Sequence, residues 1–196
     1  MHTPQRITPP TTLPVSMIDA KLHLRVDHDD EDLLIEGLTK AATDHLDGWT
    51  GILGRCLEEQ EWRQDFDGFE NFRLPLWPVN SITSITWRNS AGQIATIDSD
   101  AYALKGDALG AYVRFKDGFS YPSGLYQSAA MSVTFRVGYP QAGEPPQSTV
   151  PAAIKAAILL LVGHWYKNRE AVSDNGPAEL PLAVDALLAP YRRVGL

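Results

Sequence analysis

The sequence predicts an α+β protein, with a small core of about four helices contributed by both chain ends and an antiparallel β lobe inserted between them. Three observations lead to this fold class. Apolar residues recur at helical spacing over 30–49, and residues 151–170 form a second, strongly apolar helix. The segment between them consists of short runs rich in aromatic and β-branched residues. We therefore expect a helical core over 15–55 and 150–193 and a β lobe over 56–140.

The first helical segments carry recognisable start and stop signals. Residues 1–14 are rich in proline, so we expect an extended arm rather than a packed element. Ser16 followed by Asp19 resembles a capping box and begins a short helix over about 16–25. The helix over 30–49 has its apolar residues within an arc of ~140°. These residues are Leu34, Ile35, Leu38, Ala41, Ala42, His45, Leu46 and Trp49.

The helix over 151–170 is apolar on more than one side. Its main stripe consists of Ile154, Ala157, Ile158, Leu161, Val162 and Trp165. Leu159, Leu160 and Tyr166 fall outside that stripe. Such a helix needs cover on more than one side, and in a chain this short we expect a neighbouring subunit to supply part of it. Pro181 begins a last short helix, and residues 194–196 form a C-terminal tail.

The β lobe is predicted from alternating and β-branched runs bounded by turn residues. Candidate strands cover 60–66, 81–88, 93–97 and 111–115, and 131–137 places every second apolar residue on one face. The proline-rich and glycine-rich stretch over 137–149 is a loop that returns the chain to the helical core.

Composition restricts the function classes. With 196 residues, 44% hydrophobic and 21% charged, the chain is long enough for one good core with an appended lobe. A net charge of −7 argues against a general nucleic-acid binder, although it allows a protein past which DNA slides. The single Cys56, the missing signal pattern and an apolar run far below the ~20 residues of a membrane span predict a soluble, unsecreted protein.

Metal ligands crowd together only at Asp27–Asp32. An EF-hand loop starting at Asp27 would need glycine at its sixth position and glutamate at its twelfth, where Asp32 and Leu38 stand. We interpret the run as a helix cap, with Asp27 or Asp29 as the N-cap, and as a solvated charged segment. The competing hypothesis is a small metal-dependent hydrolase or nuclease using His23, Asp27, His28 and Asp30. No phosphate-binding loop or nucleophile motif is present, so we expect no catalytic residue, metal or cofactor.

Ordered segments over 21–38, 74–85, 164–172 and 180–192 resemble the head-tail connector, or adaptor, proteins of long-tailed bacteriophages and prophages. They include Leu74-Pro-Leu-Trp-Pro-Val-Asn near the middle and His164-Trp-Tyr-Lys-Asn-Arg near the end. The resemblance runs from about Leu13 to Arg193 and points to the subgroup with a β insertion. Each motif is a packing pattern rather than a catalytic signature, and the ordered set carries the resemblance.

This resemblance implies a structural virion protein that acts without catalysis. Family members form a homo-oligomeric ring of about a dozen copies under the portal protein, joining the DNA-filled head to the neck or tail. DNA passes through the lumen without sequence-specific binding, and a stopper or tail-terminator protein binds downstream. The resemblance also implies that the protein is assembled in the host cytoplasm and lies in the neck of the virion. A tail-completion or stopper role is the alternative within this class.

Two sets of residues are predicted to make these contacts. The subunit interface set is Leu38, His45, Trp49, Ile158, Leu161, Trp165 and Arg169, and the portal contact set is Tyr191, Arg192, Arg193 and Leu196. For Arg169 two interpretations are open. It either covers the end of its own helix, or it pairs across a subunit interface with an acid of the 30–49 helix.

Overall fold

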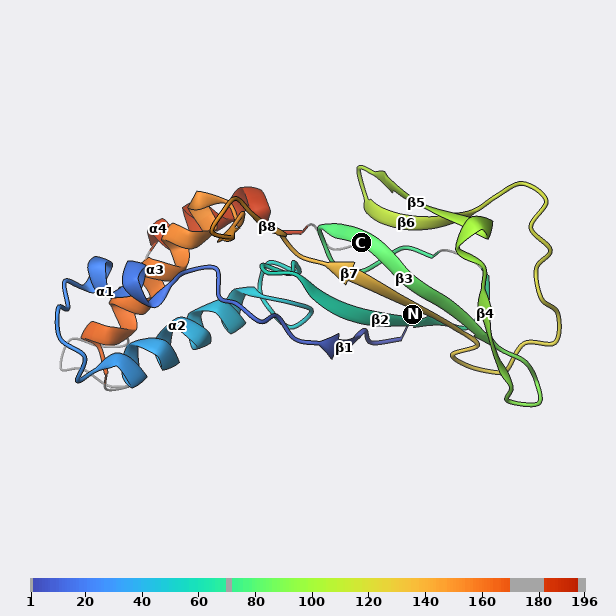
Figure 1. Ribbon diagram of the computed structural model, residues 1–196, viewed down its shortest axis with the longest axis horizontal. Coiled ribbons are helices and arrows are strands. Elements are labelled where there is room, and N and C mark those ends of the chain that lie inside the picture. Colours follow the sequence, from blue (N-terminus) through green and yellow to red (C-terminus); the bar gives the residue numbers. More distant parts are fainter. Residues whose placement is uncertain (1, 70–71, 170–181, 194–196) are drawn as a thin grey trace. The chain divides into compact units, whose positions relative to one another are not determined.

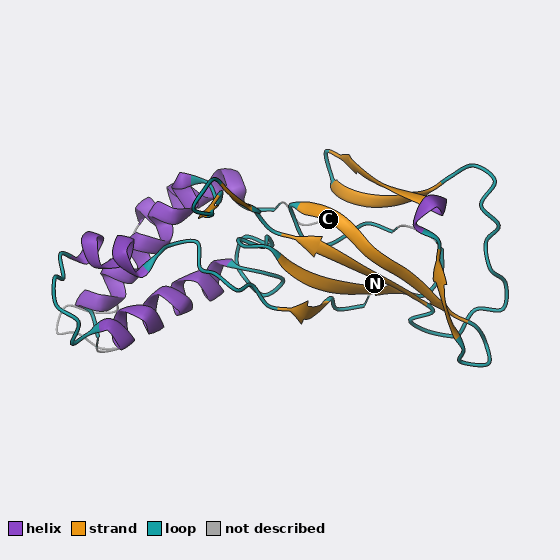
Figure 2. Cartoon of the chain, viewed as in Figure 1, coloured by secondary structure: helices purple, strands orange, loops and turns teal. Residues whose placement is uncertain are grey.

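The computed structural model describes residues 2–69, 72–169 and 182–193. The chain forms two compact units. The β unit contains the N-terminal segment up to Pro10 and Glu59–Gly138, and the helical unit contains Thr11–Glu58 and the segment from Tyr139 onward. All four α-helices of the described residues belong to the helical unit (Figures 1 and 2). The predicted α+β class is confirmed.

The helical unit is built from α1 (Met17–Leu24), α2 (Asp32–Leu46), α3 (Ala152–Lys167) and α4 (Leu182–Leu188), followed by the 3₁₀ turn η2 (Ala189–Tyr191). It also contains a small ribbon, β8 (Gln141–Ala142) with β9 (Gln147–Ser148). The predicted capping box begins α1, because Ser16 Oγ accepts from the Asp19 N–H at 3.1 Å and donates to the Asp19 carboxylate at 2.7 Å. Pro181, the predicted start of the last helix, lies outside the described residues.

The buried face of helix α2 overlaps the one its apolar residues predict but is shifted around the helix. The buried residues are Ile35, Thr39, Ala42, Thr43 and Leu46. Leu34, Leu38 and His45 are only half-buried and Ala41 is exposed, so the buried face is turned by roughly 70° from the predicted arc. Each threonine hydroxyl donates to the carbonyl four residues earlier at 2.8 Å, which lets both side chains enter the core with their polar group satisfied.

Helix α3 is the centre of the helical unit. Ile154, Ala157, Ile158, Leu161 and Val162 are buried, as the main apolar stripe predicts. The additional apolar residues Leu159, Leu160 and Tyr166 are partly buried and pack against the same core. Helices α1, α2 and α4 all contact α3. The chain's own helices therefore supply much of the cover for which we expected a neighbouring subunit.

The β unit contains an antiparallel sheet with the strand order β1-β2-β7-β3-β4. These strands are β1 (Gln5–Thr8), β2 (Gln60–Phe66), β3 (Val79–Arg88), β4 (Ile94–Ile97) and β7 (Met131–Val137). The central strand β7 buries Met131, Val133, Phe135 and Val137, which confirms the alternation predicted for 131–137. A separate hairpin pairs β5 (Tyr102–Asp107) with β6 (Gly110–Phe115), after the 3₁₀ turn η1 (Ser99–Ala101).

The first residues of the chain pack against the sheet instead of forming the free arm expected from their prolines. Strand β1 adds to the edge of the sheet beside β2, with Gln5 opposite Arg63 and Arg6 opposite Trp62. The Arg6 guanidinium lies 5.2 Å from the centre of the Trp62 ring. Proline is tolerated at such an edge because one side of the strand needs no ladder hydrogen bonds.

Candidate functional site

The residues predicted for the subunit interface all lie in the helical unit but differ in accessibility. Ile158 and Leu161 are completely buried in its core, so their side chains support the fold of their own subunit. Trp49 is 43% exposed, and Leu38 is half-buried at the edge of the same core. The accessible members of the set, rather than the buried ones, can therefore meet a neighbour.

His45 and Trp165 form a contact between α2 and α3. Their ring centroids are 6.4 Å apart and the rings are nearly perpendicular, at 73°. This edge-to-face arrangement is favourable for aromatic rings. Both residues are half-buried, so the pair forms an apolar edge of the helical unit that is still partly open to solvent.

Arg169 is held within its own chain. Its Nη2 donates to Glu31 Oε1 at 2.6 Å, while the Tyr166 hydroxyl donates to Glu31 Oε2. The guanidinium also lies 4.7 Å from the centre of the Tyr166 ring. The hydrogen bonds from Tyr166 and then Arg169 lower the pKa of Glu31. The acid that the sequence suggested as a partner for Arg169 across an interface is thus supplied, at the start of α2, by the same subunit.

The residues predicted for portal contact follow α4. The Tyr191 carbonyl accepts from Arg55 Nε at 2.6 Å, and the Arg193 N–H donates to the Leu53 carbonyl at 3.2 Å. The exposed Arg192 pairs with Asp185 at 2.6 Å. Leu196 lies outside the described residues. The backbone of this segment is therefore anchored, while the Arg192 side chain points to solvent.

Most acids of the Asp27–Asp32 segment form ion pairs on the surface. Lys21 Nζ donates to Asp29 at 2.6 Å and to Asp32 at 2.8 Å, and His28 lies 3.7 Å from Asp30. The N-cap of α2 is Glu31, not Asp27 or Asp29 as predicted, and no side chain caps the helix.

The alternative metal site is not assembled in the structure. Its proposed ligand His23 lies beside Gly163 of α3 and, like Asp27, His28 and Asp30, is exposed. Across residues 2–69, 72–169 and 182–193, no three His, Cys, Asp or Glu side chains come close enough together to hold a metal ion. The geometry therefore gives no support to the metal-dependent enzyme hypothesis.

No helix within the described ranges is long and apolar enough to cross a bilayer.

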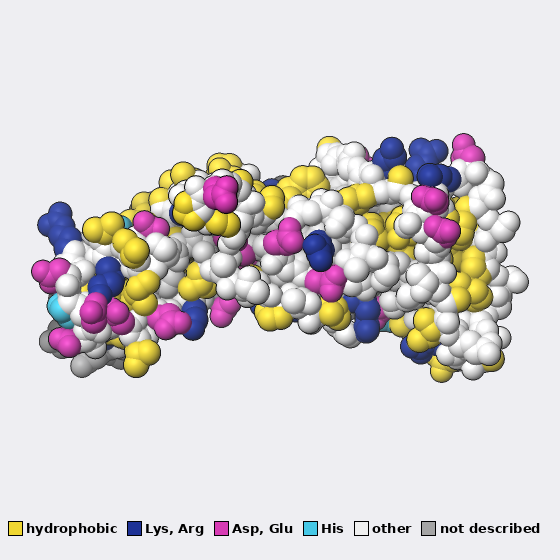
Figure 3. All heavy atoms as spheres, viewed as in Figure 1, with side chains coloured by type: hydrophobic (Ala, Val, Ile, Leu, Met, Phe, Trp, Pro, Cys, Tyr) yellow, Lys and Arg dark blue, Asp and Glu magenta, His cyan; other side chains and the backbone are white. Residues whose placement is uncertain are grey.

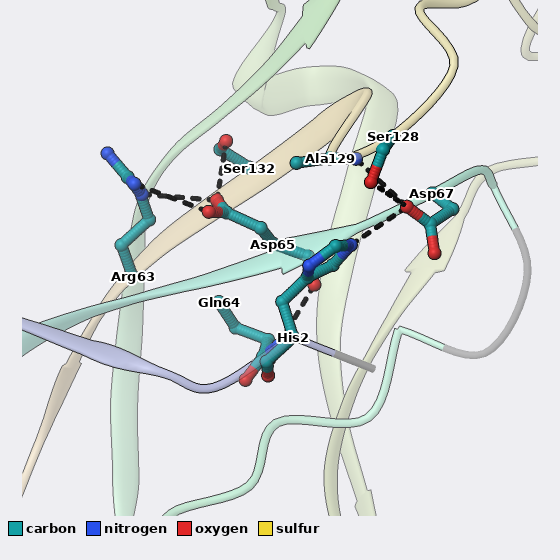
Figure 4. A network of polar contacts seen from close by, with 8 residues as sticks. All are labelled: His2, Arg63, Gln64, Asp65, Asp67, Ser128, Ala129 and Ser132. Atoms are coloured by element: carbon teal, nitrogen blue, oxygen red, sulfur yellow. Dashed lines mark hydrogen bonds and ion pairs between the residues drawn. The ribbon is translucent and has the colours of Figure 1, made fainter.

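A polar network attaches the residues before β1 to the rest of the β unit (Figure 4). Asp67 Oδ1 accepts from His2 Nε2 at 2.8 Å, from the Ala129 N–H at 2.9 Å and from Ser128 Oγ at 3.2 Å. The bond from His2, followed by that from Ala129, lowers the pKa of Asp67 to about 2. Gln64 donates to the His2 carbonyl at 2.7 Å and completes the attachment.

An aromatic hollow in the β unit was not expected from the sequence. Phe115 stacks on Phe119 with centroids 4.5 Å apart, and Tyr121 meets both rings edge-on. The hollow beside them has a volume of about 550 Å³, and its lining includes Arg114 and Lys116. Figure 3 shows basic side chains, with acidic ones beside them, over the β5-β6 hairpin. The sequence signal was the clustering of aromatic residues in the turn after β6, which alternation alone does not detect.

Comparison with known proteins identifies relatives of both units. Residues 15–194 match the model of the head completion protein family. The structure is similar to a chain of the virion of a native gene transfer agent particle, with a TM-score of 0.76 and 19% identity, covering 100% of this chain and 97% of that one. No curated protein sequence matches.

Two further solved structures share the fold. One is the neck of an empty gene transfer agent particle computed with C6 symmetry, with a TM-score of 0.76, 18% identity and coverage of 100% and 97%. The other is the neck of the native particle computed with C12 symmetry, with a TM-score of 0.66, 18% identity and 97% coverage of each chain. The predicted resemblance to head-tail connector proteins is confirmed by the family match, which extends through the helical core and the β insertion. The chain belongs to the head completion protein family.

Proposed function

We propose that this protein is a structural virion protein of the neck, a head-tail connector that joins the DNA-filled head to the neck or tail. The observation that carries the proposal is the continuous family match over residues 15–194, which spans both units. The solved structures with the same fold come from the neck of a particle, which supports the same location. The protein is assembled into the particle in the host cytoplasm.

The working form is a closed ring of about a dozen copies, as the C12 symmetry of the similar neck structure suggests. A ring needs two different lateral faces on each subunit, because each copy contacts its neighbours head to tail. The accessible interface residues Leu38, His45, Trp49, Trp165 and Arg169 contribute to one such face. Ile158 and Leu161 support that face from the core below it.

The ring has a protein partner on each side. The portal protein binds the segment at Tyr191, Arg192, Arg193 and Leu196. A stopper or tail-terminator protein binds the opposite side. The backbone anchoring of Tyr191 and Arg193 supports this assignment, since it presents the Arg192 side chain from a fixed position.

The charge distribution suits a wall past which DNA moves. The helical unit contains 15 acidic and nine basic residues, a formal charge of −6, and the β unit contains nine acidic and eight basic residues, a formal charge of −1. An acidic surface repels phosphate and disfavours sticking. DNA therefore passes through the lumen without sequence-specific binding, and the protein performs its role without catalysis or a cofactor.

Complementation of particles that lack this protein tests the proposal. Particles made without it should accumulate as filled heads separated from tails, and the purified full-length protein should restore joining. Fractionation distinguishes the connector from the tail-completion alternative, because a connector should sediment with portal-bearing heads before tails are added. Normal joining without the protein, or binding only to isolated tails, would reject the connector role.

A further inference from the structure

The aromatic hollow of the β unit is built to receive an apolar side chain. Phe115 is almost buried, Phe119 is half-buried and Tyr121 is 58% exposed, so the stacked rings form a wall that opens to solvent. A hollow of about 550 Å³ lined by such rings is large enough for one or two aliphatic side chains. Exposed aromatic walls of this kind are typical of protein contact sites.

The hollow is bordered by unpaired positive charge. Lys116 and Arg114 are among the residues that line it. In the described part of the chain these two side chains have no ion pair or hydrogen bond. One acid, Asp117, also lines the hollow. Its chemistry therefore suits an acidic segment that carries an exposed aliphatic residue.

The start of α2 has that chemistry. Asp27 is exposed, and the Asp30 side chain is 95% exposed with only a 3.7 Å approach from His28. Leu33, the second residue of the helix, is 86% exposed. The neighbouring Asp29 and Asp32 both form ion pairs with Lys21, which leaves the group with one net negative charge. Asp27, Asp30 and the exposed leucine thus lie within seven residues of one another.

We propose that the hollow of one copy receives the Asp27–Leu33 segment of the next copy, with Leu33 against the aromatic wall and Asp27 and Asp30 against the basic border. This inference rests on the proposed ring. The two surfaces are different and complementary, which is the arrangement that repeats head to tail around a closed ring. DNA is the less favoured occupant, because phosphate leaves the aromatic wall unfilled and unpaired cations would hold back a moving strand.

Charge reversal tests the contact. The full-length variants Arg114→Glu/Lys116→Glu and Asp27→Lys/Asp30→Lys should each lower ring assembly on portal-bearing heads by about tenfold or more, since like charges then face each other. Combining all four substitutions in one chain should restore assembly to within about threefold of the original protein. Lys167→Glu and Asp44→Lys are matched controls on other exposed positions and should leave assembly unchanged.

Cysteine cross-linking tests whether the two surfaces touch between copies, and so distinguishes this contact from a change that the substitutions cause within one subunit. Leu33→Cys and Tyr121→Cys change exposed residues, and the native Cys56 is buried. A mixture of the two variants should form a disulfide-linked dimer under mild oxidation, whereas each variant alone should form little. Circular dichroism on every variant confirms that the fold is retained.

The outcomes separate this inference from the proposed function. Rings that assemble normally from both reversed variants, or a mixture that does not cross-link, would overturn the contact while leaving the connector role intact. Loss of affinity for a DNA duplex from Arg114→Glu/Lys116→Glu, with assembly unchanged, would assign the hollow to DNA instead. Failure of the unaltered protein to join heads would reject the connector role itself.

Discussion

Arg169 and Glu31 join the end of α3 to the start of α2 through a 2.6 Å ion pair. The same glutamate accepts a hydrogen bond from Tyr166, so one carboxylate connects both helix ends. This arrangement is favourable for both helix dipoles, because the acid Glu31 lies at the N-terminus of α2 and the base Arg169 lies at the C-terminus of α3. The pair fixes how the two longest helices of the described residues meet.

Glu31→Gln should lower the melting temperature slightly. It should also make the melting temperature fall less as the pH is lowered. Tyr166 and Arg169 hold the pKa of Glu31 below its ordinary value of 4.5. The stabilisation is therefore present above pH 4.5 and is lost as the pH falls through the lower pKa of the folded state. Thermal melts between pH 3 and 7 measure this. Glu36→Gln, on the exposed Glu36-Lys40 pair, is the control, and an identical pH profile for both variants would contradict the role of Glu31.

Asp67→Asn should loosen β1. The carboxylate accepts from His2, Ala129 and Ser128, and its pKa is lowered to about 2. This contribution is complete above pH 3.8 and declines as the pH falls toward 2. Hydrogen exchange at Gln5–Thr8 should become faster in the variant at neutral pH. Unchanged exchange there, with Asp98→Asn as a control that leaves β1 untouched, would show that the network does not hold the strand.

Glu58→Gln should stabilise the protein at neutral pH. Burial raises the pKa of Glu58 above its ordinary value of 4.5, and hydrogen bonds such as the one from Thr12 at 3.3 Å offset this only in part. A raised pKa in the folded state means that stability falls as the pH rises from 4.5 through that pKa. Urea unfolding at pH 5 and pH 7.5 measures the difference. A glutamine variant that is less stable at pH 7.5 would contradict the expectation.

Thr39→Ala should destabilise the helical unit more than Ala41→Thr. Thr39 is 2% exposed and Ala41 is exposed, although the apolar pattern of the helix predicts the opposite order. Removing the buried methyl and hydroxyl should cost about 1–2 kcal/mol, whereas the surface change should stay within about 0.5 kcal/mol. Chemical denaturation gives both values, and a larger effect at Ala41 would restore the predicted face.

Trp165→Ala should impair ring assembly, while Trp165→Phe should retain it in part. The indole meets His45 edge-on at 6.4 Å and is half-buried at the accessible edge of the helical unit. Phenylalanine keeps an aromatic edge there. Sedimentation of head-bound protein measures assembly, and a melting curve of each variant separates assembly from folding. Full assembly by the alanine variant would remove Trp165 from the interface.

Sequence patterns correctly predicted the elements in which the polarity of each residue matches its burial. The stripe from Ile154 to Val162 and the alternation from Met131 to Val137 contain no buried polar group that could obscure the pattern. The capping box at Ser16 is a local signal and needs no tertiary information. Each of these predictions was therefore correct at the level of the element.

Other features depend on contacts that a pattern does not contain. Thr39 and Thr43 enter the core because their hydroxyls bond locally to helix carbonyls, which hides their polarity. Strand β5, with Lys105, Gly106 and Asp107 exposed at its end, lacks apolar alternation and was missed. The sequence also did not show whether the acid that pairs with Arg169 comes from the same subunit or from a neighbouring one. An acid near the start of α2 is compatible with either case.

Electron microscopy of portal-bearing heads incubated with the full-length protein tests the central claim most directly. The connector role predicts a closed ring of about a dozen copies at a single vertex, between the portal and the site where the tail attaches. Protein bound only to tails, or heads that carry no added ring and yet still join tails, would contradict it.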